Sequence, residues 1–90
     1  MAFEWDPRKA ESNYRKHGVR FSEAEAVFED DRALTIRDED SDPSEIRFVT
    51  LGAGLKGRLL VVVYCYRGTR IRLISARVAE AHECRQYQEN

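Results

Sequence analysis

The sequence predicts an α+β fold with two N-terminal helices, a four-stranded antiparallel sheet and a C-terminal helix. Helix-capping signals come first along the chain, the apolar residues then change from a period near 3.6 to a period of two, and short turns separate the apolar segments that follow. Ninety residues, of which 42% are hydrophobic, suit a single domain over residues 1–90 with its own core.

Two segments near the N-terminus carry the helix signals. Asp6 followed by Pro7 fits an N-cap with a proline at the first helical position, and the basic pair before Gly18 fits a helix end. A helix is therefore expected over residues 7–16. The segment 21–28 (FSEAEAVF) has capping-box spacing, and its first aromatic residue can act as a hydrophobic staple, which predicts a short second helix.

Four apolar segments predict the strands of an antiparallel meander: residues 33–37, 46–51, 59–66 and 70–76. The segment 59–66 (LLVVVYCY) is apolar at every position, so it is expected at the centre of the sheet with both faces covered. The segment 79–89 (AEAHECRQYQE) predicts a polar terminal helix. The large apolar side chains expected in the core are those of Trp5, Phe21, Phe28, Phe48, Val61 and Val63.

Charge is divided unevenly along the chain. Residues 1–45 carry 13 acidic and 7 basic side chains, whereas residues 46–90 carry 3 acidic and 8 basic ones. The 32 residues from 46 to 77 contain no carboxylate and seven cations: Arg47, Lys56, Arg58, Arg67, Arg70, Arg72 and Arg77. This pattern predicts a positive surface that binds a polyanion, because a guanidinium binds phosphate through two parallel hydrogen bonds. The alternative is that these cations pair with the acidic half of the chain.

Several classes of protein do not fit the sequence. Its longest apolar run, residues 59–66, is far shorter than the ~20 residues of a membrane span, so no membrane partner and a cytoplasmic location are expected. Cys65 and Cys84 do not form a disulfide framework, and together with His17 and His82 they lack the spacing of a metal site. Motifs for nucleotide cofactors are absent as well. We therefore expect neither a metal nor a cofactor.

The remaining side chains suit metal-independent cleavage of RNA by its own 2′-hydroxyl. That reaction needs a base, an acid, and cations on the phosphate oxygens. Candidates for proton transfer and charge stabilisation are His17, Glu83 and the arginines of the last strand and its preceding turn, so the expected catalytic residues are His17, Arg67, Arg72, Arg77 and Glu83. The expected RNA-binding residues are Lys16, Arg47, Arg58, Arg70 and Tyr87.

Each of these roles has a plainer alternative. His17 precedes a helix-ending glycine, where a basic side chain simply faces the helix dipole. Glu83 and Tyr87 are four residues apart and share a helix face, where they equally suit an exposed glutamate and a tyrosine that covers the sheet edge.

Motifs from Glu4 to Arg77 follow one another in an order that resembles the BrnT family. They are Glu4-Trp5-Asp6-Pro7, Lys9, Asn13, Lys16-His17-Gly18-Val19, Phe21, Glu23-Ala24, Glu45, Arg47, Gly52, Gly57-Arg58 and Ile71 to Arg77 (IRLISAR). The resemblance implies a RelE-like ribonuclease toxin of a type II toxin–antitoxin pair. It also implies a BrnA-type antitoxin that neutralises the toxin and helps to repress the shared operon, so that operator DNA is contacted only through the antitoxin complex.

Two other readings remain open from the residues alone. One is a non-catalytic nucleic-acid-binding or regulatory module on the same fold, and the other is a structural protein whose positive face binds an acidic partner. Binding and cleavage of RNA require the same cations, so composition does not separate them.

Overall fold

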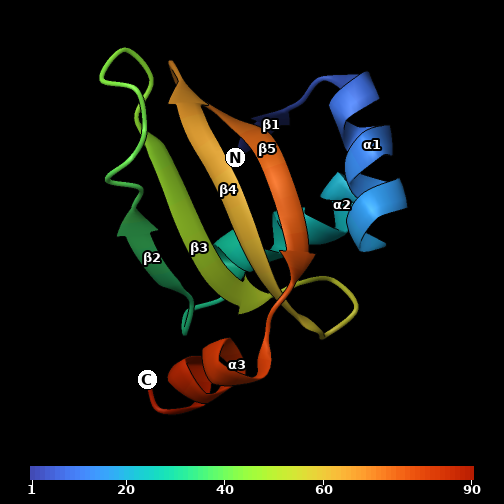
Figure 1. Cartoon of the computed structure of the whole chain (residues 1–90), viewed down its shortest axis with the longest axis vertical. Coiled ribbons are helices and arrows are strands. Elements are labelled where there is room, and N and C mark those ends of the chain that lie inside the picture. Colours follow the sequence, from blue (N-terminus) through green and yellow to red (C-terminus); the bar gives the residue numbers. More distant parts are fainter.

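The computed structural model describes all residues from 1 to 90 and combines a five-stranded sheet with three α-helices (Figure 1). In chain order the elements are β1 (Ala2–Glu4), α1 (Pro7–His17), α2 (Phe21–Ala24), the 3₁₀ helix η1 (Glu25–Glu29), β2 (Leu34–Arg37), β3 (Arg47–Ala53), β4 (Leu59–Arg67), β5 (Arg70–Val78) and α3 (Ala81–Gln88). None of the helices is long and apolar enough to cross a membrane.

The predicted meander is confirmed. Strands β2 to β5 pair antiparallel with their neighbours in sequence, and the sheet order is β1-β5-β4-β3-β2. The apolar segment that was expected at the centre is β4, which pairs with β3 on one side and β5 on the other. A β-bulge between Val63 and Tyr64 shifts the register with β5.

The predicted four-stranded sheet is wrong by one strand. Residues 2–4 form β1, which pairs in parallel with the start of β5, so that Phe3 lies opposite Ile71 and Glu4 opposite Arg72. A three-residue strand is too short to show a period of two, and its partner lies 68 residues later in the chain. The sequence therefore contains no local signal for this pairing.

The first predicted helix is confirmed, whereas the second differs in detail. Helix α1 has the expected Asp6 cap, whose side chain accepts from the Arg8 N–H, and Gly18 ends it in the left-handed conformation. The second segment begins one residue before Ser22, without any capping bond, and changes from α to 3₁₀ geometry at Glu25. The buried side chains of this segment are three residues apart: Phe21, Ala24 and Val27. Because a 3₁₀ helix has three residues per turn, it keeps side chains with this spacing on one face.

The two faces of the sheet differ in their cover. On the helix-covered face, α2 and η1 lie behind the sheet and α1 lies beside β5 (Figure 1), and Leu60, Val62, Tyr64, Ile71 and Leu73 pack into the core. Alternate residues point the other way and define the open face, where only α3 lies across one end. The open face carries Leu34, Ile36, Arg47, Val49, Leu51, Val61, Val63, Cys65, Arg67, Arg70, Arg72 and Arg77.

The expectation that both faces of β4 are covered holds for most of the strand, although helices cover only one of the two faces. Val61 and Cys65 are still buried on the open face, because neighbouring strand side chains and α3 shield them. Phe21 and Val61 are buried as predicted, whereas Trp5, Phe28, Phe48 and Val63 are only partly buried. Most of these partly buried side chains form the margin of the core.

Candidate functional site

A shallow cleft of about 200 Å³ lies between α1 and β5. Its lining is polar and contains Lys9, Ser12, Asn13, Lys16, His17, Ile74 and Ser75. No carboxylate forms an ion pair with Lys9, Lys16 or His17, unlike most arginines of the sheet. Two unpaired ammonium groups, an imidazole and two hydroxyls in one cleft suit an anionic group such as a phosphate.

Helical spacing brings the α1 side chains of the cleft together. Lys9, Ser12 and Lys16 are separated by three and four residues, so they lie along one face of α1. His17 is the last residue of the helix, and Gly18 follows with φ 68° and donates its N–H to Tyr14 O. The left-handed turn at Gly18 directs the chain away, so His17 remains at the end of the cleft.

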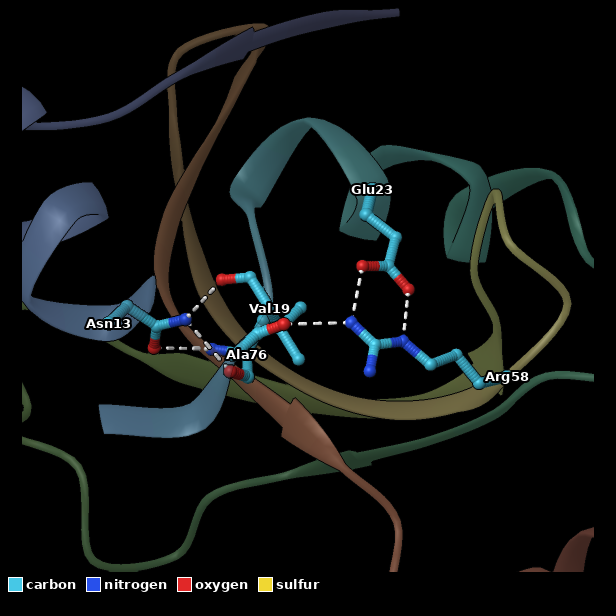
Figure 2. Close-up of polar contacts among 6 residues, drawn as sticks. Asn13, Val19, Glu23, Arg58 and Ala76 are labelled. Atoms are coloured by element: carbon cyan, nitrogen blue, oxygen red, sulfur yellow. Dashed lines mark hydrogen bonds and ion pairs between the residues drawn. The ribbon is translucent and has the colours of Figure 1, made fainter. Parts of the chain in front are cut away.

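Asn13 attaches the floor of this cleft to the sheet (Figure 2). Its Nδ2 donates to Val19 O at 3.0 Å and to Ala76 O at 2.9 Å, and its Oδ1 accepts from the Ala76 N–H at 3.0 Å. Strand β1 ends opposite Arg72 and does not reach Ala76 of β5. The Asn13 side chain therefore makes the hydrogen bonds to Ala76 that a neighbouring strand would otherwise make. Asn13 is 7% exposed, and its bonds therefore hold α1 in one position on β5.

A second polar contact holds the turn that follows His17 (Figure 2). Arg58 donates from Nε and Nη2 to the two carboxylate oxygens of Glu23 at 2.7 and 2.8 Å, and from Nη2 to Gly18 O at 2.8 Å. These hydrogen bonds lower the pKa of the buried Glu23 carboxyl, although its burial acts in the opposite direction. Arg58, a predicted RNA-binding residue, is therefore engaged in a structural ion pair.

The other predicted arginines on β4 and β5 also have carboxylate partners. Arg67 pairs with Glu45 at 3.0 Å, Arg72 pairs with Glu4 at 2.8 Å, and Arg70 lies 3.9 Å from the same Glu4. These acids come from the first half of the chain, so the separation of charge along the sequence is largely cancelled in space. The prediction of a strongly positive sheet is therefore wrong, because most of its arginines are neutralised by glutamates. Among the arginines of the open face, Arg47 alone has no carboxylate partner.

Arg77 and Glu83 join β5 to α3. Arg77 donates to both carboxylate oxygens of Glu83 at 2.8 and 2.9 Å, and the Glu80 N–H donates to the same carboxylate. The hydrogen bond from Arg77 is the main cause that lowers the pKa of Glu83 to about 2. A carboxyl with this pKa carries no proton near neutral pH, so in this arrangement Glu83 does not serve as a general acid.

Tyr87, a predicted base-stacking residue, lies on the far part of α3. Its hydroxyl donates to Asp30 Oδ2 at 2.7 Å, and this hydrogen bond raises the pKa of Tyr87. The Arg32 guanidinium lies 5.4 Å above the Tyr87 ring. Tyr87 therefore helps to attach α3 to the loop after η1.

Among the predicted site residues, the structure brings only Lys16 and His17 together in the cleft. The predicted arginines, Glu83 and Tyr87 do not line it. Sequence reasoning assigned no role to Lys9, Ser12 or Ser75, although Lys9 belongs to a motif and lies two helical turns before Lys16. No group of three or more His, Cys, Asp or Glu side chains is placed to hold a metal ion, and both cysteines are free.

Comparisons with known proteins identify the family and the fold of the chain. The family model described as the ribonuclease toxin BrnT of type II toxin–antitoxin systems matches residues 5–83, which include every residue of the cleft. The crystal structure of the Brucella abortus ribonuclease toxin BrnT is similar to this chain with a TM-score of 0.70 and 26% sequence identity. The similarity covers 89% of this chain and 97% of that one. No curated protein sequence matches the chain.

Proposed function

Because the chain belongs to the BrnT family of ribonuclease toxins of type II toxin–antitoxin systems, we propose that it is a metal-independent endoribonuclease whose reaction takes place in the α1–β5 cleft. The observation that carries this proposal is the group formed by Lys9, Lys16 and His17, which have no carboxylate partners. A toxin that arrests growth by cutting cellular RNA acts in the cytoplasm, so that is its proposed location, and residues 1–90 are its proposed single domain.

Each polar residue of the cleft has a proposed task. A scissile phosphate bound between Lys9 and Lys16 would have its non-bridging oxygens close to two ammonium groups, whose attraction increases as negative charge develops in the transition state. His17 is the proposed group that takes the proton of the 2′-hydroxyl as its oxygen bonds to phosphorus, because histidine as a residue type exchanges protons near neutral pH. The bond between phosphorus and the 5′-oxygen breaks, and the leaving oxygen takes a proton from water. No step requires a metal or a cofactor.

The predicted arginines remain candidates for contacts with the RNA backbone outside the cleft. Arg47 is exposed and unpaired, so it is free to bind a phosphate. Arg67 and Arg72 would have to exchange Glu45 and Glu4 for phosphate oxygens. Because its pKa is about 2, Glu83 is a poor proton carrier, and its proposed role is to orient Arg77.

The test is cleavage of single-stranded RNA by purified variants that keep the wild-type circular dichroism spectrum. His17→Ala should reduce the cleavage rate by roughly 10²-fold and Lys16→Ala by roughly 10-fold, since general catalysis and charge stabilisation contribute factors of this size. Lys56→Ala is the matched control, because this exposed lysine lies in the β3–β4 turn away from the cleft.

The substrate and the buffer supply two more controls. RNA with a 2′-deoxy nucleotide at the cleavage position should stay intact, and EDTA should not change the rate. Wild-type cleavage by both His17→Ala and Lys16→Ala would place the reaction elsewhere, and inhibition by EDTA would refute the metal-independent mechanism.

A non-catalytic RNA-binding module is the second candidate. It is favoured by the presence of a single histidine in the cleft, because cleavage usually uses both an acid and a base. In that case the wild-type protein would bind RNA and its 2′-deoxy analogue equally and cut neither.

We also propose that a BrnA-type antitoxin neutralises this toxin and that the complex, rather than the toxin alone, contacts operator DNA. An antitoxin that covers the positive side chains would contact Arg47, Arg58, Arg67, Arg72 or Arg77. Since all of these except Arg47 already have a carboxylate partner, Arg47 is the best placed to meet an acidic partner.

A further inference from the structure

The open face contains an apolar groove of about 330 Å³ between strands β2 to β4 and α3. Two residues of α3, Glu83 and Gln86, contribute to its lining. The other lining side chains are aliphatic and come from the strands: Leu34, Ile36, Val49, Leu51 and Val61. Ile36 is 66% exposed on β2, the edge strand of the sheet. An exposed aliphatic side chain beside an open groove on an edge strand is typical of a surface that binds another chain.

Unpaired positive charge lies beside this groove. Arg47 alternates with Val49 and Leu51 along β3, so all three side chains belong to the open face. Arg47 is exposed and has no carboxylate partner. The same face also carries Arg67, Arg70, Arg72 and Arg77, which share three glutamates as ion-pair partners, so Arg47 is the arginine of this face that remains without a carboxylate.

The composition of the groove favours a protein over RNA. Nucleobases bind by stacking on aromatic rings, but the groove has none. The aromatic residues of the neighbouring strands pack together on the helix-covered face instead, as Phe48 does against Tyr64 with 5.9 Å between ring centroids. Because Arg47 has no carboxylate partner and the groove beside it is apolar, the complementary occupant is an acidic segment with one apolar side.

We propose that the groove and Arg47 form the docking surface for an acidic, amphipathic segment of the antitoxin. A large apolar side chain of that segment fills the groove, and a carboxylate beside it pairs with Arg47. The choice of the antitoxin rests on the proposed function, whereas the position of the surface rests on the groove and the charges around it. The cleft between α1 and β5 is a separate surface.

The test is calorimetric titration of the full chain with a purified BrnA-type antitoxin. Ile36→Glu should weaken binding at least 10-fold, because it places a carboxylate at the mouth of the groove and adds a negative charge facing an acidic partner. Arg47→Glu should weaken binding by a similar factor. Leu55→Glu is the matched control, since Leu55 is 74% exposed and lies outside the groove, and it should change affinity less than twofold.

Ile36→Thr keeps the β-branched shape and serves as the second variant if the glutamate destabilises β2. Without antitoxin, Ile36→Glu should cleave RNA like the wild type, so a failure of the proposed ribonuclease activity would be seen separately from a failure of docking. Wild-type affinity of the Ile36 variants for the antitoxin would overturn the proposal. An equal loss of RNA binding by Ile36→Glu would also overturn it, and so would a wild-type dimer that Ile36→Glu converts to a monomer.

Discussion

Helices α1 and α3 are both attached to β5 by hydrogen bonds of polar side chains, but the two attachments differ in how far they are buried. At the α1 junction, Asn13 is 7% exposed and bonds main-chain groups of β5, and the neighbouring Glu23 of α2 is 4% exposed and pairs with Arg58 just before β4. At the α3 junction, no residue of the helix is buried, and the Arg77 side chain is 37% exposed. Burial therefore makes the first junction part of the core, whereas the second is attached at the surface.

This difference separates stability from partner binding in the molecule. Polar groups at the α1 junction have no access to water if a partner is lost, so each loss is costly. Polar groups at the α3 junction can hydrate, so their loss costs less. The proposed reaction cleft lies beside the rigid junction and the proposed docking groove beside the more adaptable one.

The largest expected effect is at the buried junction. Asn13→Ala should lower the free energy of unfolding by about 3 kcal/mol, because it leaves the Ala76 N–H, Ala76 C=O and Val19 C=O without partners. Urea unfolding at pH 7 measures this change. Ser12→Ala, at the exposed neighbouring position, is the control and should stay within ~0.5 kcal/mol of the wild type. A loss below ~1 kcal/mol for Asn13→Ala would show that this junction is not rigid.

An intermediate effect with a distinct pH dependence is expected at the α3 junction. The pKa of Glu83 is lowered from 4.5 to about 2, so its ion pair stabilises the fold above the unfolded-state pKa and is lost as the pH falls from about 4.5 to 2. Glu83→Gln should reduce the free energy of unfolding by about 1–2 kcal/mol at neutral pH, after allowance for solvent screening at the half-exposed Arg77.

The free energies of unfolding of the wild type and of Glu83→Gln should therefore differ most at neutral pH and become equal near pH 2. Urea midpoints measured across this range provide the comparison, and Glu89→Gln on the exposed helix end is the control. A constant difference between wild type and Glu83→Gln at every pH would mean that the ionised pair is not the source of the stability.

The smallest effect is expected at the turn after His17. Gly18→Ala should cost about 1 kcal/mol, because φ is 68° and a side chain is strained there, although an added Cβ would meet no atom within 4 Å. Thermal unfolding measures the cost, and RNA cleavage reports whether His17 has moved. Wild-type stability would show that the turn relaxes, which would weaken the case for a fixed His17.

Local signals explain why much of the fold was predictable. The Asp6 and Gly18 caps, the apolar segment of β4 and the tight turns between strands act over a few residues, so they are visible in the sequence. Strand β1 was missed because it pairs with a distant segment, and η1 because burial rather than capping shapes it. For the site, the motifs that contain His17 and Ser75 were visible, but Ser12 lies in no motif and the sequence does not reveal that β5 places Ser75 beside α1.

What the sequence determined by itself is the elements other than β1 and η1, the meander and membership of a toxin family, since all of these depend on local pattern or on motifs in order. Only the tertiary structure decided which charges are free. Residues 46–77 hold no acid, yet Glu4, Glu23 and Glu45 reach their arginines across the fold, whereas Lys9, Lys16 and Arg47 find no carboxylate. An ion pair requires two groups within a few ångströms in space, and distance along the chain does not reveal that.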